Sequence, residues 1–167
     1  MNKKEVYQYL DAQGIRYEVA EHRPVFTVED AGALQLPHPE AGAKNLFLRD
    51  DKKKNYYLVT MRDHLTVDLK QIQQAIGSRR LSFASEEDLR KFLALERGSV
   101  TPLGLLNDAE RKVKFYLDRY FSGHLISVHP NENTATVFLQ TEALLSVLDA
   151  HGGCRGWIEF PEALERV

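Results

Sequence analysis

The sequence of 167 residues has a single cysteine, Cys154, and no long apolar run. One cysteine can form neither an internal disulfide nor, by itself, a thiolate zinc site. The apolar runs fall well short of the roughly 20 residues that span a bilayer. The charged residues at the N-terminus are not followed by the apolar stretch of a secretory signal. We therefore expect a cytoplasmic protein with no membrane partner.

An excess of positive charge is also missing, because 22 lysines and arginines face 24 acidic residues and the net charge is -2. Proteins that coat nucleic acid usually carry a basic excess that displaces counterions. Short basic clusters at 52–54, 79–80 and 111–114 are typical of solvated turns and helix faces. We expect no DNA partner, and any contact with RNA should be local.

The common catalytic motifs are absent from the sequence. It contains no Gly-x-Ser-x-Gly elbow, no Walker loop, no His-Glu-x-x-His and no Rossmann glycine triplet. Its six histidines never fall at i,i+4 on a helix together with a carboxylate. We therefore expect no metal and no cofactor, and chemistry that needs neither.

Length and composition favour one domain over residues 1–167, with 43% hydrophobic and 28% charged residues. Capping residues and apolar periodicity predict helices over 3–13, 68–76 and 141–152, one that begins at Ser85, and a short one between Thr27 and Pro37. Apolar runs predict strands at 15–19, 43–49, 56–61, 81–83, 113–117, 125–128, 134–139 and 157–160. The prediction is an α+β fold with a mixed, largely antiparallel central sheet flanked by helices.

The segment from Gly98 to Gly104 is the most informative part of the chain. Glycine brings backbone amides close to a ligand because it has no Cβ, and Pro102 makes the segment partly preordered. Ser99 and Thr101 add hydroxyl groups. Preordered donors suit an ester carbonyl or a phosphate on which negative charge develops. Taken alone, the segment is more typical of a connecting turn with no ligand.

Two other polar motifs adjoin predicted strands. Lys44 and Asn45 place a cation and an amide at the start of the apolar run 46–48. His129 opens a polar turn, His-Pro-Asn, between two predicted strands. Each motif alone also fits a structural role without a ligand. The first is then a snorkelling surface lysine, and the second is a simple turn.

Taken together and in this order, the three motifs resemble those of prolyl-tRNA editing domains. The closer resemblance is to the freestanding deacylases that remove alanine from proline tRNA. It covers nearly the whole chain, including residues 22–27, 106–108 and 153–160. The Lys-Asn pair with the glycine segment is specific to the superfamily, and the His-Pro-Asn turn points to the alanine-clearing branch.

The resemblance implies a hydrolase that acts in trans, with water attacking the ester of mischarged tRNA(Pro), Ala-tRNA(Pro) above all. Lys44 would hold the terminal phosphate or the carbonyl, and the amides of 98–104 would hold the aminoacyl carbonyl. Ser99 or Thr101 would orient the water. The candidate catalytic residues are therefore Lys44, Gly98, Ser99, Thr101 and Gly104.

By the same resemblance, Asn45 and His129 would fix the ribose and the amino group. His129 could act as a base or only as a hydrogen-bond partner. Val25, Phe26 and Thr27 are candidate walls of a pocket that accepts one methyl group and rejects the pyrrolidine ring. As apolar residues, they are also plausible members of the core.

The partners that follow are the acceptor end of mischarged tRNA(Pro) and prolyl-tRNA synthetase. Two alternatives stay open: the same fold could clear cysteine or serine, or the chain could be a non-catalytic module that binds tRNA ends or a synthetase. An intact Lys44 and an uninterrupted glycine segment count against the second alternative.

Overall fold

The computed structural model describes residues 1–26 and 28–160. Its strands are β1 (Tyr17–Glu21), β2 (Ala43–Asp50), β3 (Tyr56–Arg62), β4 (Leu81–Phe83), β5 (Val113–Asp118), β6 (Leu125–Val128), β7 (Ala135–Gln140) and β8 (Arg155–Ile158). The α-helices are α1 (Lys3–Ala12), α2 (Val28–Ala33), α3 (Leu69–Ile76), α4 (Glu86–Leu93) and α5 (Thr141–His151). Short 3₁₀ helices are η1 (Pro39–Ala41), η2 (Pro102–Asn107) and η3 (Arg119–Phe121).

The strands form two hydrogen-bonded sheets, with the orders β1-β7-β6 and β4-β2-β3-β5-β8. All pairings in the three-stranded sheet are antiparallel, as are β2 with β3 and β2 with β4. The pairings of β3 with β5 and of β5 with β8 are parallel. The predicted α+β fold with mixed, largely antiparallel pairing is confirmed. The division into two sheets was not predicted, because apolar alternation locates strands without stating which strands pair.

Local capping explains where the helices begin and end. Asp68 and Ser85 each close a capping box at the start of α3 and α4, as their sequence context predicts. Gly77 ends α3 in the left-handed conformation that glycine adopts at little cost. The predicted cap at Thr27 lies outside the described residues.

Strand β2 has two faces that pack into different cores. Ala43 and Phe47 contact the larger core, which also holds residues of β6, β7 and α5. Leu46 and Leu48 face the smaller core with Ile72 of α3. This alternation is the period of two that a strand imposes, and it fixes the directions of Lys44 and Asn45.

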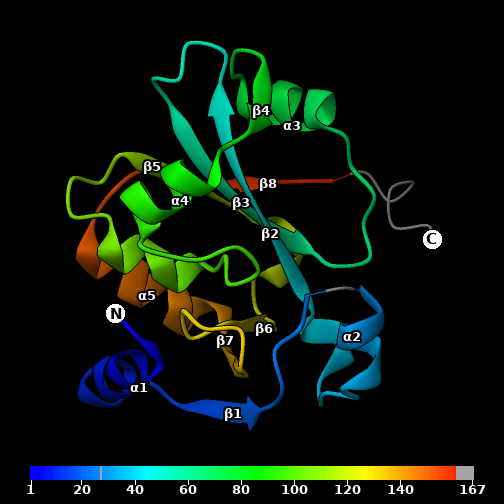
Figure 1. Cartoon of the computed structure of the whole chain (residues 1–167), viewed down its shortest axis with the longest axis vertical. Coiled ribbons are helices and arrows are strands. Elements are labelled where there is room, and N and C mark those ends of the chain that lie inside the picture. The colour runs from blue at the N-terminus through cyan, green and yellow to red at the C-terminus, as the bar shows by residue number, and fades with distance from the viewer. Residues whose placement is uncertain (27, 161–167) are drawn as a thin grey trace.

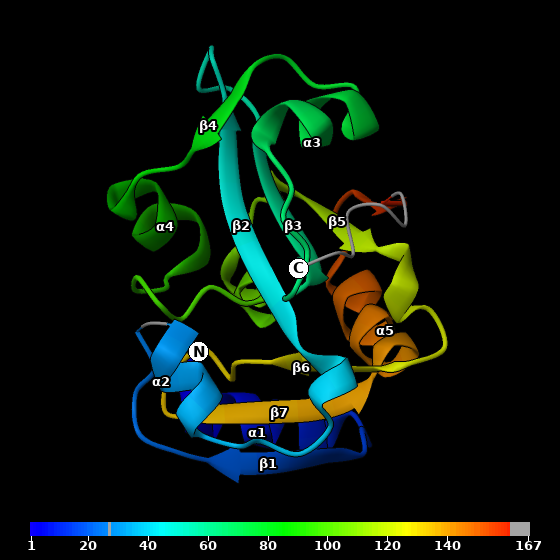
Figure 2. The ribbon, with the colours of Figure 1, turned by 90° about the vertical axis from the view of Figure 1, so that its right-hand side faces the viewer.

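The long strand β2 connects the two ends of the molecule (Figure 1). At one end lie the β2–β3 turn, β4 and α3. At the other end, the three-stranded sheet and α1 lie across the foot of β2, and η1 leads into the start of the strand (Figure 2). No helix in the described part of the chain is both long and apolar enough to cross a membrane.

Candidate functional site

A cavity of about 380 Å³ lies at the foot of β2. Its walls come from the start of β2, from β6 and β7, and from the segment that contains α2 and η1. The polar and titratable side chains that line it are His22, Gln35, His38, Asn45, Asp63, Ser127, His129 and Thr136. The residues are far apart in the sequence, so the cavity exists only when both sheets are assembled.

Asn45 ties the glycine segment to β2. Its side-chain Nδ2 donates a hydrogen bond to the carbonyl of Val100 at 3.1 Å. Its Oδ1 accepts a hydrogen bond from the hydroxyl of Thr60 on β3. Both ends of the Asn45 amide are therefore engaged within the protein, and they hold the segment 98–101 beside the cavity.

Thr101 ties the same segment to the histidine turn. Its hydroxyl donates to the carbonyl of His129 at 2.8 Å and accepts the amide of Leu103 at 3.4 Å. Thr101 is fully buried. The hydroxyl of Ser99, by contrast, has no hydrogen-bond partner among the described residues. Of the two predicted water-orienting hydroxyls, Ser99 is therefore the one that is available.

The amides of the glycine segment are not equivalent. Those of Ser99 and Gly104 donate to the carbonyls of Glu96 and Thr101. Within residues 1–26 and 28–160, the amides of Gly98, Val100 and Thr101 have no acceptor. These three amides are the candidate donors to a ligand.

Different physical constraints require glycine at positions 98 and 104. Gly98 has a φ of +89°, where a side chain is strained. Gly104 lies in η2, buried, and a Cβ there would be 2.5 Å from Cδ1 of Leu95. The structure therefore places Gly98 beside the candidate donors and Gly104 in the packing beneath them.

His129 presents an open ring nitrogen. Its Nδ1 lies 3.2 Å from the carbonyl of Ala135. A carbonyl can only accept, so Nδ1 carries the proton and Nε2 of the neutral ring holds a lone pair. Burial, opposed in part by the bond to Ala135, lowers the pKa of His129, and nearby His22 adds to the lowering. The ring is therefore neutral at pH 7 and can accept a proton.

Val25 lines the cavity, and its backbone is clamped by one side chain. Asn133 accepts the amide of Val25 at 3.1 Å and donates to its carbonyl at 2.5 Å. Phe26 is not among the cavity-lining residues; it is 74% exposed and lies against Gly98. Thr27, the third predicted wall residue, lies outside the described residues.

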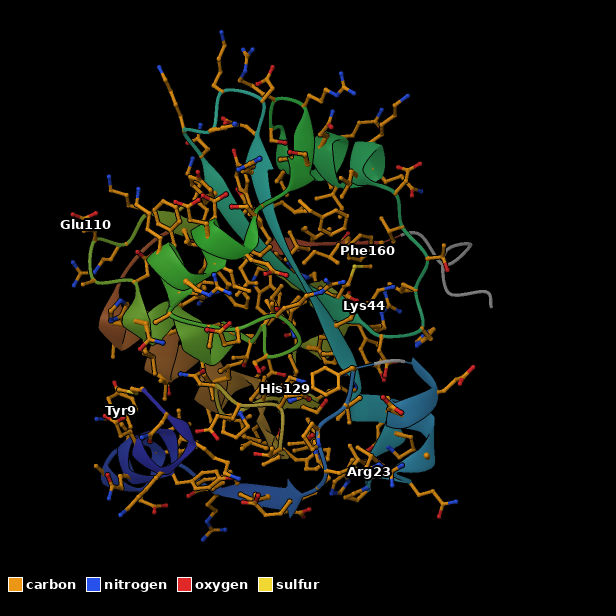
Figure 3. The ribbon with its side chains drawn as sticks, viewed as in Figure 1. Tyr9, Arg23, Lys44, Glu110, His129 and Phe160 are labelled. Atoms are coloured by element: carbon orange, nitrogen blue, oxygen red, sulfur yellow. The ribbon has the colours of Figure 1, made fainter. Side chains whose placement is uncertain are left out.

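Lys44 points away from the cavity. Ala43 and Asn45 line the cavity, so the intervening side chain lies on the opposite face of β2, where its ammonium donates to the carbonyl of Leu65. Figure 3 places Lys44 and His129 on the two sides of β2. Burial lowers the pKa of Lys44, and the nearby carboxylate of Asp63 opposes that effect.

Asp63 is a cavity residue that the sequence did not reveal. It is the carboxylate among the described cavity-lining residues. Its amide donates to the carbonyl of Gly42 at 3.1 Å, and a Cβ on Gly42 would lie 2.1 Å from its Oδ2. Gly42 therefore makes room for the carboxylate. A lone aspartate after a strand belongs to no motif, so no sequence signal singled it out.

No group of three or more His, Cys, Asp or Glu side chains is gathered for a metal ion within residues 1–26 and 28–160. Cys154 is exposed and is a free thiol. The cavity lining itself offers imidazoles, hydroxyls, side-chain amides and a carboxylate.

The chain shares this architecture with known proteins. Residues 22–147 match the family model of the aminoacyl-tRNA editing domain. The chain is 42% identical over 159 residues to the prolyl-tRNA editing protein ProX of Acetoanaerobium sticklandii, covering 95% of this chain and 97% of the relative. It is 40% identical over 159 residues to prolyl-tRNA synthetase associated domain-containing protein 1 of Mus musculus, covering 90% and 91%.

Solved structures agree on the fold. The crystal structure of a proposed trans-editing enzyme for prolyl-tRNA synthetase superimposes with a TM-score of 0.70 at 19% identity, covering 95% of this chain and 97% of that chain. That of hypothetical protein APE2540 gives 0.68 at 16% identity, covering 92% and 98%. The family model and the relatives in sequence define this chain as a tRNA-editing domain. The chain belongs to the aminoacyl-tRNA editing domain family.

Proposed function

We propose that this protein is a trans-editing hydrolase that removes alanine from mischarged tRNA(Pro). The observation that carries the proposal is the cavity lined by Val25, Asn45 and His129. Hydrogen bonds tie the segment 98–101 to two of these residues, from Asn45 to Val100 and from Thr101 to His129. It occurs in a chain that is 42% identical to a prolyl-tRNA editing protein. We expect the activity in the cytoplasm, with prolyl-tRNA synthetase as a candidate partner.

In this proposal, the aminoacyl carbonyl faces the amides of Val100 and Thr101. Hydrolysis puts negative charge on the carbonyl oxygen as the tetrahedral intermediate forms. Fixed amide donors stabilise that charge without reorganising, and one such donor is worth roughly 10²–10³ in kcat. The tie from Asn45 to Val100 keeps the donors in place.

His129 is proposed as the general base. Its Nε2 lone pair takes a proton from a water molecule that the Ser99 hydroxyl orients, and the water oxygen attacks the carbonyl carbon. Collapse of the intermediate breaks the bond between carbonyl carbon and ribose oxygen, and the proton on Nε2 passes to that oxygen. A positioned base of this kind contributes roughly 10²–10⁴.

The α-ammonium of the substrate is proposed to bind Asp63. The amide of Asn45 is engaged at both ends, so it is less suited to the amino group than the sequence suggested. The carboxylate of Asp63 has the complementary charge and lines the cavity. Lys44, on the other face of β2, is suited to a phosphate outside the cavity rather than to the carbonyl.

Selectivity would rest on size. A wall that accepts the methyl group of alanine excludes a pyrrolidine ring by overlap, and exclusion of the larger group is the easier task. Val25 and Phe138 supply apolar surface to the cavity. The clamp on the Val25 backbone would keep that wall from yielding.

The test is deacylation of tRNA(Pro) charged with alanine, proline, cysteine or serine. We expect fast release of alanine and no release of proline. Faster release of cysteine or serine would replace the proposed specificity. Binding of all four without release would identify a non-catalytic module.

A further inference from the structure

Phe26 is an aromatic side chain held out in solvent beside the cavity. Among the described residues, the large apolar side chains that are exposed are Met1, Val19, Phe26 and Phe83. Phe26 is the most exposed of these, at 74%. Isolated exposed apolar residues are common, so its position and rigidity decide whether it has a role.

The backbone at Val25 and Phe26 is held by hydrogen bonds to side chains. The preceding residue, Val25, is clamped through both its amide and its carbonyl by Asn133. The amide of Phe26 itself donates to the carboxylate of Asp30 at 3.2 Å. An exposed ring on a restrained backbone is preorganised, which lowers the entropic cost of binding against it.

The ring lies at the boundary between the cavity and solvent. Val25 lines the cavity, and Gly98 begins the segment whose free amides face the proposed ester. A Cβ on Gly98 would lie 3.7 Å from Cδ1 of Phe26, so the ring lies next to that glycine at about the distance of one added methyl group. Phe26 is therefore next in sequence to a cavity residue and next in space to the start of the segment that contains Val100.

We infer that Phe26 is the stacking platform for the terminal base of the tRNA. The inference rests on the proposed function, since it assumes that the ester of an aminoacyl nucleoside occupies the cavity. The base is attached to the ribose that carries the ester, so it is the next group outside. Base–aromatic stacking corresponds to about a 5- to 150-fold change in affinity. This role replaces the one in the pocket wall that the family resemblance implied for Phe26.

Phe83 provides a matched control. It is 60% exposed and lies on β4, where it pairs with Leu48 near the opposite end of β2 from the cavity. Replacement of Phe83 removes a comparable exposed ring without changing the residues beside the cavity.

Fluorescence tests the stack without hydrolysis. An uncharged acceptor-stem minihelix carries 2-aminopurine as its 3′-terminal base, whose emission is quenched when it stacks on an aromatic ring. We expect quenching with the wild type, Phe26→Trp and Phe83→Leu, and its loss with Phe26→Leu. Equal quenching by Phe26→Leu and the wild type, or no quenching by either, overturns the inference.

Kinetics tests the stack in the charged substrate. Alanyl-minihelices with a terminal adenosine or a terminal abasic ribose are compared. Phe26→Leu should raise KM about 5- to 150-fold for the adenosine substrate and leave the abasic one unchanged. Equal effects on both substrates overturn the inference. If the wild type hydrolyses neither substrate, the proposed function fails, and quenching of the uncharged minihelix still decides the stack.

Discussion

The buried hydroxyl of Thr101 donates a hydrogen bond of 2.8 Å to the carbonyl of His129. This bond fixes the spacing between the candidate amide donors and the candidate base. Replacement of Thr101 by valine should cost about 1–3 kcal/mol of unfolding free energy, because a buried carbonyl loses its donor. Deacylation should fall with it. Urea denaturation and kcat measure the two effects.

Thr101→Ser is the matched control, since it keeps the hydroxyl and should recover most of the stability. Ser99→Ala should leave the unfolding free energy nearly unchanged, because the buried hydroxyl loses no hydrogen bond to a described residue, while it slows deacylation. An unchanged unfolding free energy for Thr101→Val would contradict the tie between the segment and the turn.

Alanine substitutions at the two glycines should separate catalysis from stability. Gly98→Ala forces a side chain into the left-handed region at about 1–2 kcal/mol and disturbs the free amides, so kcat should fall. Gly104→Ala places a methyl group 2.5 Å from Leu95, a buried residue that has little room to move. It should destabilise the fold by about 1–3 kcal/mol and spare kcat below the melting temperature. Melting curves and initial rates measure the two effects. A fall in kcat for Gly104→Ala and a loss of stability alone for Gly98→Ala would assign catalysis to Gly104 and packing to Gly98.

His129 should set the acid limb of the pH profile. Burial lowers its pKa below 6.5, so kcat/KM should be level above pH 6.5 and fall below it, with a midpoint under that value. His129→Gln should abolish this limb and lower the rate at pH 7 by roughly 10²–10⁴. An unchanged limb in His129→Gln would assign it to another group.

The unfolding free energy should also depend on pH through His129. Because the pKa of His129 is lower in the folded protein than in the unfolded chain, folding is favoured fully above pH 6.5. The contribution is lost as the pH falls from 6.5 towards the folded pKa. The difference in unfolding free energy between the wild type and His129→Gln should therefore decrease on acidification through that window.

Asp63→Asn should weaken recognition of the substrate's ammonium group. The wild type should prefer Ala-tRNA(Pro) to its N-acetyl form by about 10- to 150-fold, the range of hydrogen bonds to charged groups. Asp63→Asn should remove most of this preference. Asp51→Asn is the control, since Asp51 pairs with Arg79 at the far end of β2. A preference retained in Asp63→Asn would assign the ammonium to another group.

Lys44→Met should raise KM with little change in kcat, because the ammonium lies outside the cavity wall. It should also reduce the slope of log KM against log salt by about 0.7–0.9, the effect of one phosphate contact. Lys44→Arg should keep the wild-type slope. A fall in kcat at constant KM would instead place Lys44 on the reacting ester.

Local signals predicted most of the fold. The helix that follows Asp68, the cap at Ser85 and the strand β4 lie where the sequence predicted them. The pairing of β3 with β5 and the separation into two sheets depend on contacts between distant segments, and no local pattern encodes such contacts.

The candidate site could be predicted only in part. Motifs drew attention to Asn45, the glycine segment and His129, which the structure brings together. Their individual roles remain predictions. The direction of Lys44 depends on strand phase, and the position of Asp63 depends on the chain turning back over Gly42. Both are set by tertiary structure.

The side chain of Asn133 pairs with the main chain of Val25 as a neighbouring strand would. It accepts a hydrogen bond from the amide of Val25 and donates one to its carbonyl. The cavity wall at Val25 is thus anchored through its main chain. The side chains along this wall are therefore not needed to hold the main chain in place. New amino acid specificities could therefore arise there by single substitutions, provided that Asn133 is kept.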